Sequence, residues 1–351
     1  MDLLPGVRSV TTDTPRLRIH HLESGPTDGV PLVLIQGNLS SGRFFEHLLP
    51  DIPDTYRVIV PDMRGFGDTE RAPLDATRGL RDWADDLAGL LDALDVDRPP
   101  HLVGWSTGAG AIAQYALNER PVASLTLIDP VGPYGFGATH RDGTPWFPDY
   151  AGSGAGIAPP EIIERLNAGD RSTDSPLSPR NVLGAFWGDA GPTDPARAEG
   201  LLDEFLKMWV SEDNFPGDSV PSENWPGVAP GTRGILNALS PKYCRWDSLV
   251  ELADKPPVMW VHGGQDAVVG NASVWDVAVL GAAGLIPGWP GEQTCPSQPM
   301  SDQIRAVLET YRQAGGTVRT EWYEDAHHLP VFEERERFLA ALTQFLAESS
   351  R

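Results

Sequence analysis

Gly104-Trp105-Ser106-Thr107-Gly108 is the stretch of this 351-residue chain that decides the fold, because it joins a predicted strand to a predicted helix. Residues 100–104 form a short apolar run, and residues 107–117 continue with the small side chains of a closely packed helix. A serine at such a strand-to-helix turn has a strained backbone that exposes its hydroxyl above the sheet. The flanking glycines suit a turn that packs tightly. The pattern therefore predicts a nucleophilic serine at the edge of a sheet, with a helix-capping serine as the alternative.

Apolar runs on both sides of this turn predict a parallel sheet. They are continuous rather than alternating, which is typical of strands covered on both faces. A helix is predicted between the second and third runs, where Trp83 and four leucines up to Leu94 share one stripe. This alternation predicts an α/β fold, with helices on both faces of a mostly parallel central sheet. The predicted strands are residues 31–36, 56–60, 100–104, 122–128, 257–262 and 317–323.

The strand–helix alternation stops after residue 130, which predicts an insertion. The inserted segment is rich in proline and glycine, and helices are predicted only at 160–167, 196–210 and 233–239. Its tryptophans make it too apolar for a disordered tether. We therefore predict a core over residues 1–130, an inserted helical cap over 131–253 (the first insertion), and the rest of the core over 254–351. A lid-like segment at 269–300 (the second insertion) interrupts the last part.

Four further motifs accompany the Ser106 turn in a fixed order. They are Ile35-Gln-Gly-Asn-Leu-Ser-Ser41, Pro61-Asp-Met-Arg-Gly-Phe-Gly-Asp68, Val261-His-Gly-Gly-Gln-Asp266 and Asp325-Ala-His-His-Leu-Pro330. Together the five motifs resemble the α/β-hydrolase superfamily, in its cap-bearing branch of esterases, lactonases and C–C hydrolases. Epoxide hydrolases and haloalkane dehalogenases of that branch have an aspartate where this chain has Ser106, so the serine argues against both activities.

The resemblance implies a catalytic triad of Ser106, His328 and Asp266. A serine hydroxyl is a weak nucleophile at neutral pH and needs an imidazole to take its proton. A buried carboxylate orients that imidazole and stabilises its charged form. Asp266 follows a strand and two glycines, where the family's acid usually lies. Asp129 is the alternative acid, because some relatives place theirs after the strand at 122–128.

The resemblance also places two backbone donors for the oxyanion of a tetrahedral intermediate, Asn38 and Thr107. Gln36 and Leu39 replace the family's usual histidine and proline, whereas Gly37 is kept. A backbone N–H donor survives both replacements. The side chain of Asn38 is either a further donor or simply part of a turn.

Other ionisable groups near these motifs are expected to be structural. His327 and Asp325 are expected at the surface, and the loop that holds Asp62, Arg64 and Asp68 is generally structural in this fold.

The aromatic content of the insertions predicts an apolar pocket above Ser106. Trp105, Trp146 and Trp187 are the candidate substrate-binding residues, and packing inside the first insertion is the alternative for the last two. The predicted function is a serine hydrolase that cleaves a carboxylic ester or lactone of an apolar or aromatic substrate through an acyl-enzyme. Two other classes stay open: a cofactor-free acyltransferase, cyclase or C–C hydrolase, and a non-enzymatic ligand receptor.

The composition of the chain limits the classes of partner that the protein is expected to bind. The formal net charge of −22 repels phosphate and anionic lipid, so we expect a small-molecule substrate and neither nucleic acid nor membrane as a partner. A homo-oligomer stays open. The chain shows no apolar run of membrane-spanning length and no signal-peptide pattern, which predicts the cytoplasm. Cys244 and Cys295 are then expected to be free thiols. No motif indicates a metal site or a cofactor.

Overall fold

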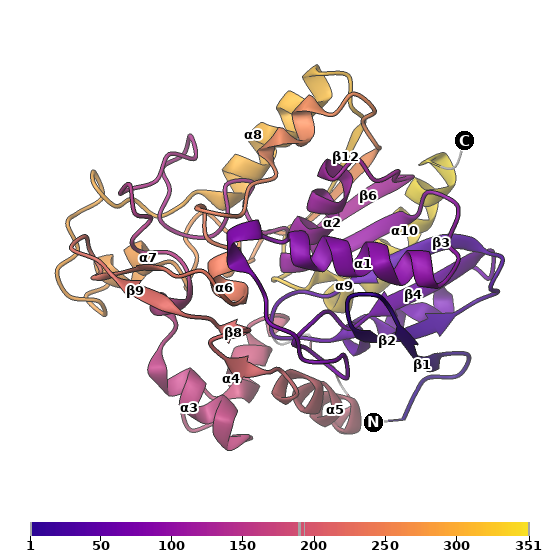
Figure 1. Ribbon diagram of the computed structural model, residues 1–351, viewed down its shortest axis with the longest axis horizontal. Coiled ribbons are helices and arrows are strands. Elements are labelled where there is room, and N and C mark those ends of the chain that lie inside the picture. The colour runs from indigo at the N-terminus through magenta and orange to yellow at the C-terminus, as the bar shows by residue number, and fades with distance from the viewer. Residues whose placement is uncertain (1, 189–190, 193, 350–351) are drawn as a thin grey trace.

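The computed structural model describes residues 2–188, 191–192 and 194–349, arranged around an eight-stranded sheet (Figure 1). The strand order is β1-β2-β4-β3-β5-β6-β11-β12. β2 pairs antiparallel with β1 and with β4, and all other neighbours are parallel. The strands are β1 (Arg8–Asp13), β2 (Arg18–Ser24), β3 (Val30–Ile35), β4 (Tyr56–Pro61), β5 (His101–Trp105), β6 (Ser124–Ile128), β11 (Val258–Gly263) and β12 (Val318–Tyr323).

Helices cover both faces of this sheet, which confirms the predicted α/β class. α1 (Arg81–Ala93) and α2 (Thr107–Leu117) lie on one face, and α10 (Arg335–Ser349) lies on the other (Figure 1). β5, β6 and β11 are buried at every position, which explains their continuous apolar sequences. Two further helices of the core are α8 (Met300–Gln313) and α9 (Pro330–Glu333).

The first insertion joins β6 to β11 and extends away from the sheet at the lower left of Figure 1. Its helices are α3 (Pro160–Ala168), α4 (Pro179–Gly184), α5 (Pro195–Leu206) and α6 (Ile235–Ala238). Its short strands are β7 (Val210–Ser211), β8 (Phe215–Pro216), β9 (Ser219–Pro221) and β10 (Val228–Pro230). The exact boundaries between core and insertions stay a prediction.

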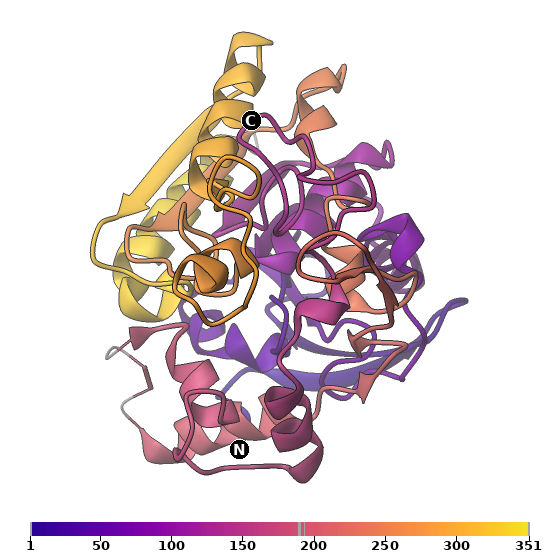
Figure 2. The same cartoon turned by 90° about the vertical axis from the view of Figure 1, so that its left-hand side faces the viewer.

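The second insertion packs against the first (Figure 2). It contains the short helix α7 (Val277–Ala282), whose Val277 and Ala278 share a small buried cluster with Trp146 of the first insertion. Cys295 belongs to the same cluster, while Cys244 is buried in the main core. Both cysteines are free thiols, as predicted.

The parallel strands set the position of the candidate site. β3, β5, β6, β11 and β12 run in the same direction, so their carboxyl ends meet at one edge of the sheet. Loops at this edge carry the motifs that were recognised in the sequence. A crevice at the carboxyl edge is where α/β folds bind ligands. Among the helices of the described residues, none is long and apolar enough to cross a bilayer.

Candidate active site

Ser106 occupies the turn between β5 and α2 with the strained backbone that its motif predicts. Its φ of 53° and ψ of −114° are unusual for a residue with a side chain, a strain that costs about 1–3 kcal/mol. The backbone N–H of Ser106 donates to the carbonyl of Ile128 on β6 at 2.8 Å, which helps to hold the turn. A Cβ atom at Gly104 would come within 2.5 Å of the Gly108 carbonyl oxygen, and one at Gly108 would collide with the backbone of Gln36. Both glycines are therefore required by the packing of the turn.

His328 and Asp266 form a buried hydrogen-bonded pair at the same edge of the sheet. Nδ1 of His328 lies 2.9 Å from Oδ2 of Asp266. The other carboxylate oxygen accepts the backbone N–H groups of Val268 and Val269 at 2.7 and 3.0 Å. Burial acts to raise the pKa of Asp266, but the charge and hydrogen bond of His328 outweigh it and hold the pKa well below its usual value. Asp266 is therefore ionised at neutral pH.

The glycine run after β11 brings this pair together. A Cβ atom at Gly263 or Gly264 would strike the backbone of residues 324–327, so only glycine lets the two loops touch. The backbone N–H of Gln265 also donates to the Ala326 carbonyl at 2.8 Å. The two glycines thus allow the loop of Asp266 to pack directly against the loop of His328.

The loop after β3 lies beside Ser106, and Gln36 fixes its shape. The side-chain amide of Gln36 donates to the carbonyl of Ser40 and accepts the backbone N–H of Met63 at 3.3 Å. Gln36 therefore ties the loop to the end of β4, a role that the sequence did not reveal. The side chain of Asn38 accepts the N–H of Leu39 at 3.0 Å, in agreement with the interpretation of Asn38 as a turn residue.

Ser106, His328, Asn38 and Thr107 all line one cavity of about 130 Å³. Within the described part of the chain, the backbone N–H groups of Asn38 and Thr107 have no hydrogen-bond partner. Thr107 also opens α2, where the helix dipole favours negative charge. The predicted oxyanion donors therefore line the same cavity as Ser106 and His328.

The remaining wall of the cavity is apolar and comes mostly from the insertions. Among the described residues that line it, none is Asp, Glu, Lys or Arg. The sequence predicted an apolar pocket, but it gave no signal for the particular side chains that form its wall, because most of them come from irregular segments. The first insertion contributes Phe136, Ile157, Ile162, Phe186, Phe215 and Leu236, and Val268, Val269 and Trp275 come from the loop after β11 and the second insertion.

None of the three candidate substrate-binding tryptophans is among the residues that line this cavity, and each of them packs elsewhere. Trp105 is fully buried and donates from Nε1 to the carbonyl oxygen of His328 at 2.7 Å, which supports the histidine from behind. Trp146 packs into the cluster between the insertions. Trp187 packs against Phe44 and Phe332, with ring centroids 6.3 and 5.3 Å away. Large aromatic side chains bury the most area when they pack inside a core, which favours buried positions for these tryptophans over positions in the cavity wall.

His327, next to His328, has a structural partner. Its Nδ1 lies 2.7 Å from Oε1 of Glu333, and its backbone N–H donates to Oε2 at 2.6 Å. Burial raises the pKa of Glu333 despite this contact. The pair fastens the histidine loop to α9, and Asp325 of the same loop is exposed, as expected.

Asp62, Arg64 and the residues around them serve the scaffold. Asp62 accepts the backbone N–H groups of Gly42 and Asp68 and lies 2.7 Å from Nδ1 of His20. Nε2 of His20 contacts Ser9 Oγ at 2.8 Å. Ser9 on β1, His20 on β2 and Asp62 after β4 thus form a second Ser–His–Asp chain, none of which is among the residues that line the cavity.

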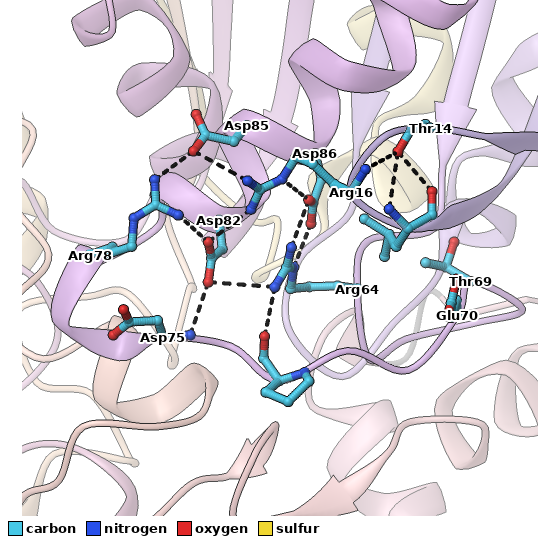
Figure 3. A network of polar contacts seen from close by, with 12 residues as sticks. Thr14, Arg16, Arg64, Thr69, Glu70, Asp75, Arg78, Asp82, Asp85 and Asp86 are labelled. Carbon is cyan, nitrogen blue, oxygen red and sulfur yellow. Dashed lines mark hydrogen bonds and ion pairs between the residues drawn. The ribbon is translucent and has the colours of Figure 1, made fainter.

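Arg64 lies in a separate ionic network on α1 (Figure 3). It binds Asp86 with two nitrogens and donates to the carbonyl of Pro73 at 2.6 Å. Asp82 in the same network also forms ion pairs with Arg16 and Arg78. These contacts agree with the structural role expected for this loop.

Known proteins share this architecture. The family described as alpha/beta hydrolase fold matches residues 30–153. An esterase from Rhodococcus sp. ECU1013 superposes with a TM-score of 0.58 and 21% identity, covering 97% of this chain and 98% of that one. The meta-cleavage product hydrolase of Pseudomonas fluorescens IP01 gives a TM-score of 0.57 with 19% identity, over 97% and 98% of the two chains.

Sequence relatives match over a shorter range. A cis-3-alkyl-4-alkyloxetan-2-one decarboxylase from Xanthomonas campestris is 34% identical over 131 residues, which is 34% of this chain and 43% of that protein. A 2-hydroxy-6-oxo-2,4-heptadienoate hydrolase from Pseudomonas putida is 37% identical over 108 residues, or 30% and 38% of the two chains. The matches thus span about two-fifths of these relatives. The family match over residues 30–153, together with the shared fold, supports membership of the α/β-hydrolase superfamily.

Proposed function

We propose that the protein is a serine hydrolase that cleaves a neutral carboxylic ester or lactone with an apolar acyl group, through an acyl-enzyme. The observation that carries this proposal is the meeting of four groups in one apolar cavity. These are the hydroxyl of Ser106, the imidazole of His328, and the unbonded N–H groups of Asn38 and Thr107. Together they supply a nucleophile, a base and an oxyanion hole.

The roles follow from the hydrogen bonds. Because Nδ1 of His328 faces the Asp266 carboxylate, Nδ1 carries the proton and Nε2 is left as the basic nitrogen. His328 takes the proton of Ser106 as Oγ attacks the carbonyl carbon, and it then returns that proton to the leaving alkoxide. Water repeats the sequence on the acyl-enzyme and releases the acid. The N–H groups of Asn38 and Thr107 stabilise the oxyanion in both steps.

The apolar wall favours a neutral substrate over the substrates of some relatives. The Pseudomonas putida relative is called a dienoate hydrolase, so its substrate is named as a carboxylate. A carboxylate held in an apolar cavity would need a cationic partner. The described lining residues include neither Lys nor Arg. Ester or lactone hydrolysis is therefore favoured over C–C hydrolysis of such an acid.

Stopped-flow assays with p-nitrophenyl esters test the proposal. Wild-type protein is expected to release a burst of p-nitrophenol followed by steady turnover, and Ser106→Ala is expected to lose about 10⁶-fold in kcat. More than a tenth of the activity left in purified Ser106→Ala would contradict the proposal. A burst without turnover that an added alcohol relieves would indicate acyl transfer, and the absence of any burst or turnover would favour the ligand receptor.

A further inference from the structure

Asp129, the alternative acid in the sequence, lies behind Asp266 in a fully buried position at the end of β6. Its backbone has a φ of 38°, and its N–H donates to the carbonyl of Val261 at 2.9 Å. Oδ1 accepts the backbone N–H of Gly263 at 3.0 Å and lies 2.9 Å from Nδ1 of His262. Oδ2 is buried as well, and no described residue donates a hydrogen bond to it. An ionised carboxylate would not leave a buried oxygen without a donor.

A second buried carboxyl group, that of Asp266, lies close to Asp129. One polar atom each of Asp129, His262 and Asp266 lie within 4.8 Å of one another. Both oxygens of Asp266 already accept hydrogen bonds, from the Val268 and Val269 N–H groups and from His328. Two buried carboxyl groups this close do not both ionise, so one of them retains its proton.

The surroundings decide which group retains it. Burial and the negative charge of Asp266 raise the pKa of Asp129 well above its usual value. Asp266 is held ionised by His328. His262 supplies no charge, because burial lowers its pKa to about 4. Arg305 of α8 acts on His262 and lies over the Trp260 ring at 5.2 Å.

We propose that Asp129 is a neutral carboxylic acid whose Oδ2–H donates a hydrogen bond to the Asp266 carboxylate and thereby positions Asp266 for His328. This role for Asp129 rests on the proposed function, in which Asp266 orients the base. The protonated acid gives the unpartnered oxygen a hydrogen bond and leaves Oδ1 free to accept from Gly263. Asp129 is then a positioning residue, one step removed from the reacting atoms, rather than the acid of the triad.

Infrared difference spectroscopy of wild type against Asp129→Asn tests the protonation directly, without reference to activity. At pH 8 the account expects a carboxylic-acid C=O band in wild type that is absent from Asp129→Asn. Asp276→Asn is the matched control, because Asp276 is also buried but its pKa, raised by burial to about 6, leaves it ionised at pH 8. The Asp276→Asn spectrum is expected to retain the band. Absence of the band in wild type would overturn the proposal even if the protein proves to be an active esterase.

Kinetics then tests the positioning role. An asparagine at position 129 keeps a donor for Asp266 and an acceptor for Gly263, so Asp129→Asn should retain kcat/KM within about tenfold, with the acid limb of its pH profile unmoved. Asp129→Leu removes the donor and should lose about 10- to 100-fold in kcat, the worth of a hydrogen bond to a charged group. A loss near 10⁴-fold in folded Asp129→Asn would make Asp129 the triad acid and overturn the proposal. An acid limb that shifts by about a pH unit or more would also overturn the proposal. Activity that a chelator abolishes would overturn it as well, because it would indicate a metal ion held by Asp129, His262 and Asp266.

Discussion

The carboxyl edge of the sheet and the two insertions contribute to the cavity in different ways. At the edge, Ser106 and Asp266 are held by backbone hydrogen bonds, and glycines at fixed positions allow the loops to touch. In the insertions, the cavity wall consists of single apolar side chains from irregular segments, such as Phe186 and Trp275. On the proposed function, the core supplies the catalytic groups and the insertions shape the pocket that receives the substrate. Changes at the edge should therefore act on kcat, and changes in the wall should act on specificity.

The largest effect is expected at the edge, from Asp266→Asn. The amide keeps the shape of the side chain but favours the wrong tautomer of His328, which costs about 10⁴-fold in kcat in the best-studied triad. Steady-state assays near pH 7 on folded protein measure it. Asp325→Asn, in the exposed part of the histidine loop, is the control and should change kcat by less than about twofold. Equal losses of kcat in both variants would contradict a specific role of Asp266 in orienting His328.

A large change in stability without a change in chemistry is expected from Trp146→Ala. The side chain is 7% exposed and packs in the cluster that joins the two insertions. Truncation of a buried tryptophan costs about 3–5 kcal/mol in the free energy of unfolding, which urea denaturation measures. At temperatures where the variant is folded, KM for bulky and small esters should stay as in wild type. A selective rise in KM for bulky esters would instead indicate that Trp146 contacts the substrate.

A larger side chain in the cavity wall should change only the specificity for the acyl chain of the ester. Ile162 on α3 lines the cavity, whereas Glu164 on the same helix is exposed. Ile162→Trp is expected to lower kcat/KM for long-chain p-nitrophenyl esters by about 10- to 100-fold and to spare the acetate, since a mismatch of size in an apolar pocket is worth about 1–3 kcal/mol. Glu164→Trp should leave both unchanged. If Ile162→Trp slows acetate and long-chain esters equally, the wall does not select the acyl group.

The smallest effect concerns the opposite end of β5. His101 is buried there beside Ser124, and burial lowers its pKa to about 4. An unfolded imidazole titrates near pH 6.5, so the unfolded state binds more protons between pH 4 and 6.5, and stability rises with pH across that window. His101→Gln should reduce this slope by up to about 1.4 kcal/mol per pH unit. Urea midpoints at several pH values measure the slope. Ser124→Ala, which keeps the histidine, should retain the slope, and an identical slope in His101→Gln would refute the account.

The sequence predicted the edge of the sheet well because its rules are local. The strained turn at Ser106 requires Gly104 and Gly108, and the glycines after β11 let the next loop approach the histidine loop. Each of these residues has a fixed place relative to a strand end. β1 and β2 were not predicted, because β2 buries polar residues such as His20 and His21 and does not have the pattern of a buried strand.

The wall of the cavity could not be predicted because its side chains are selected by tertiary packing. Trp146 and Phe136 are both aromatic residues of the first insertion, yet only Phe136 reaches the cavity. Nothing in the local pattern distinguishes a tryptophan that closes a cluster from a phenylalanine that faces a substrate. Gln36 was noted only as a departure from the family motif. Its bridge from the Ser40 carbonyl to the Met63 N–H depends on two loops that are distant in sequence.

Covalent trapping of Ser106 tests the central claim most directly. Wild-type protein is incubated with a fluorophosphonate, and the modified residue is located by peptide mass spectrometry, with Ser106→Ala and His328→Ala in parallel. The account predicts one adduct per chain, on Ser106, with no adduct in Ser106→Ala and slow labelling in His328→Ala. Labelling elsewhere, such as on Ser9 of the second Ser–His–Asp chain, with Ser106 unmodified and esterase activity lost, would contradict it.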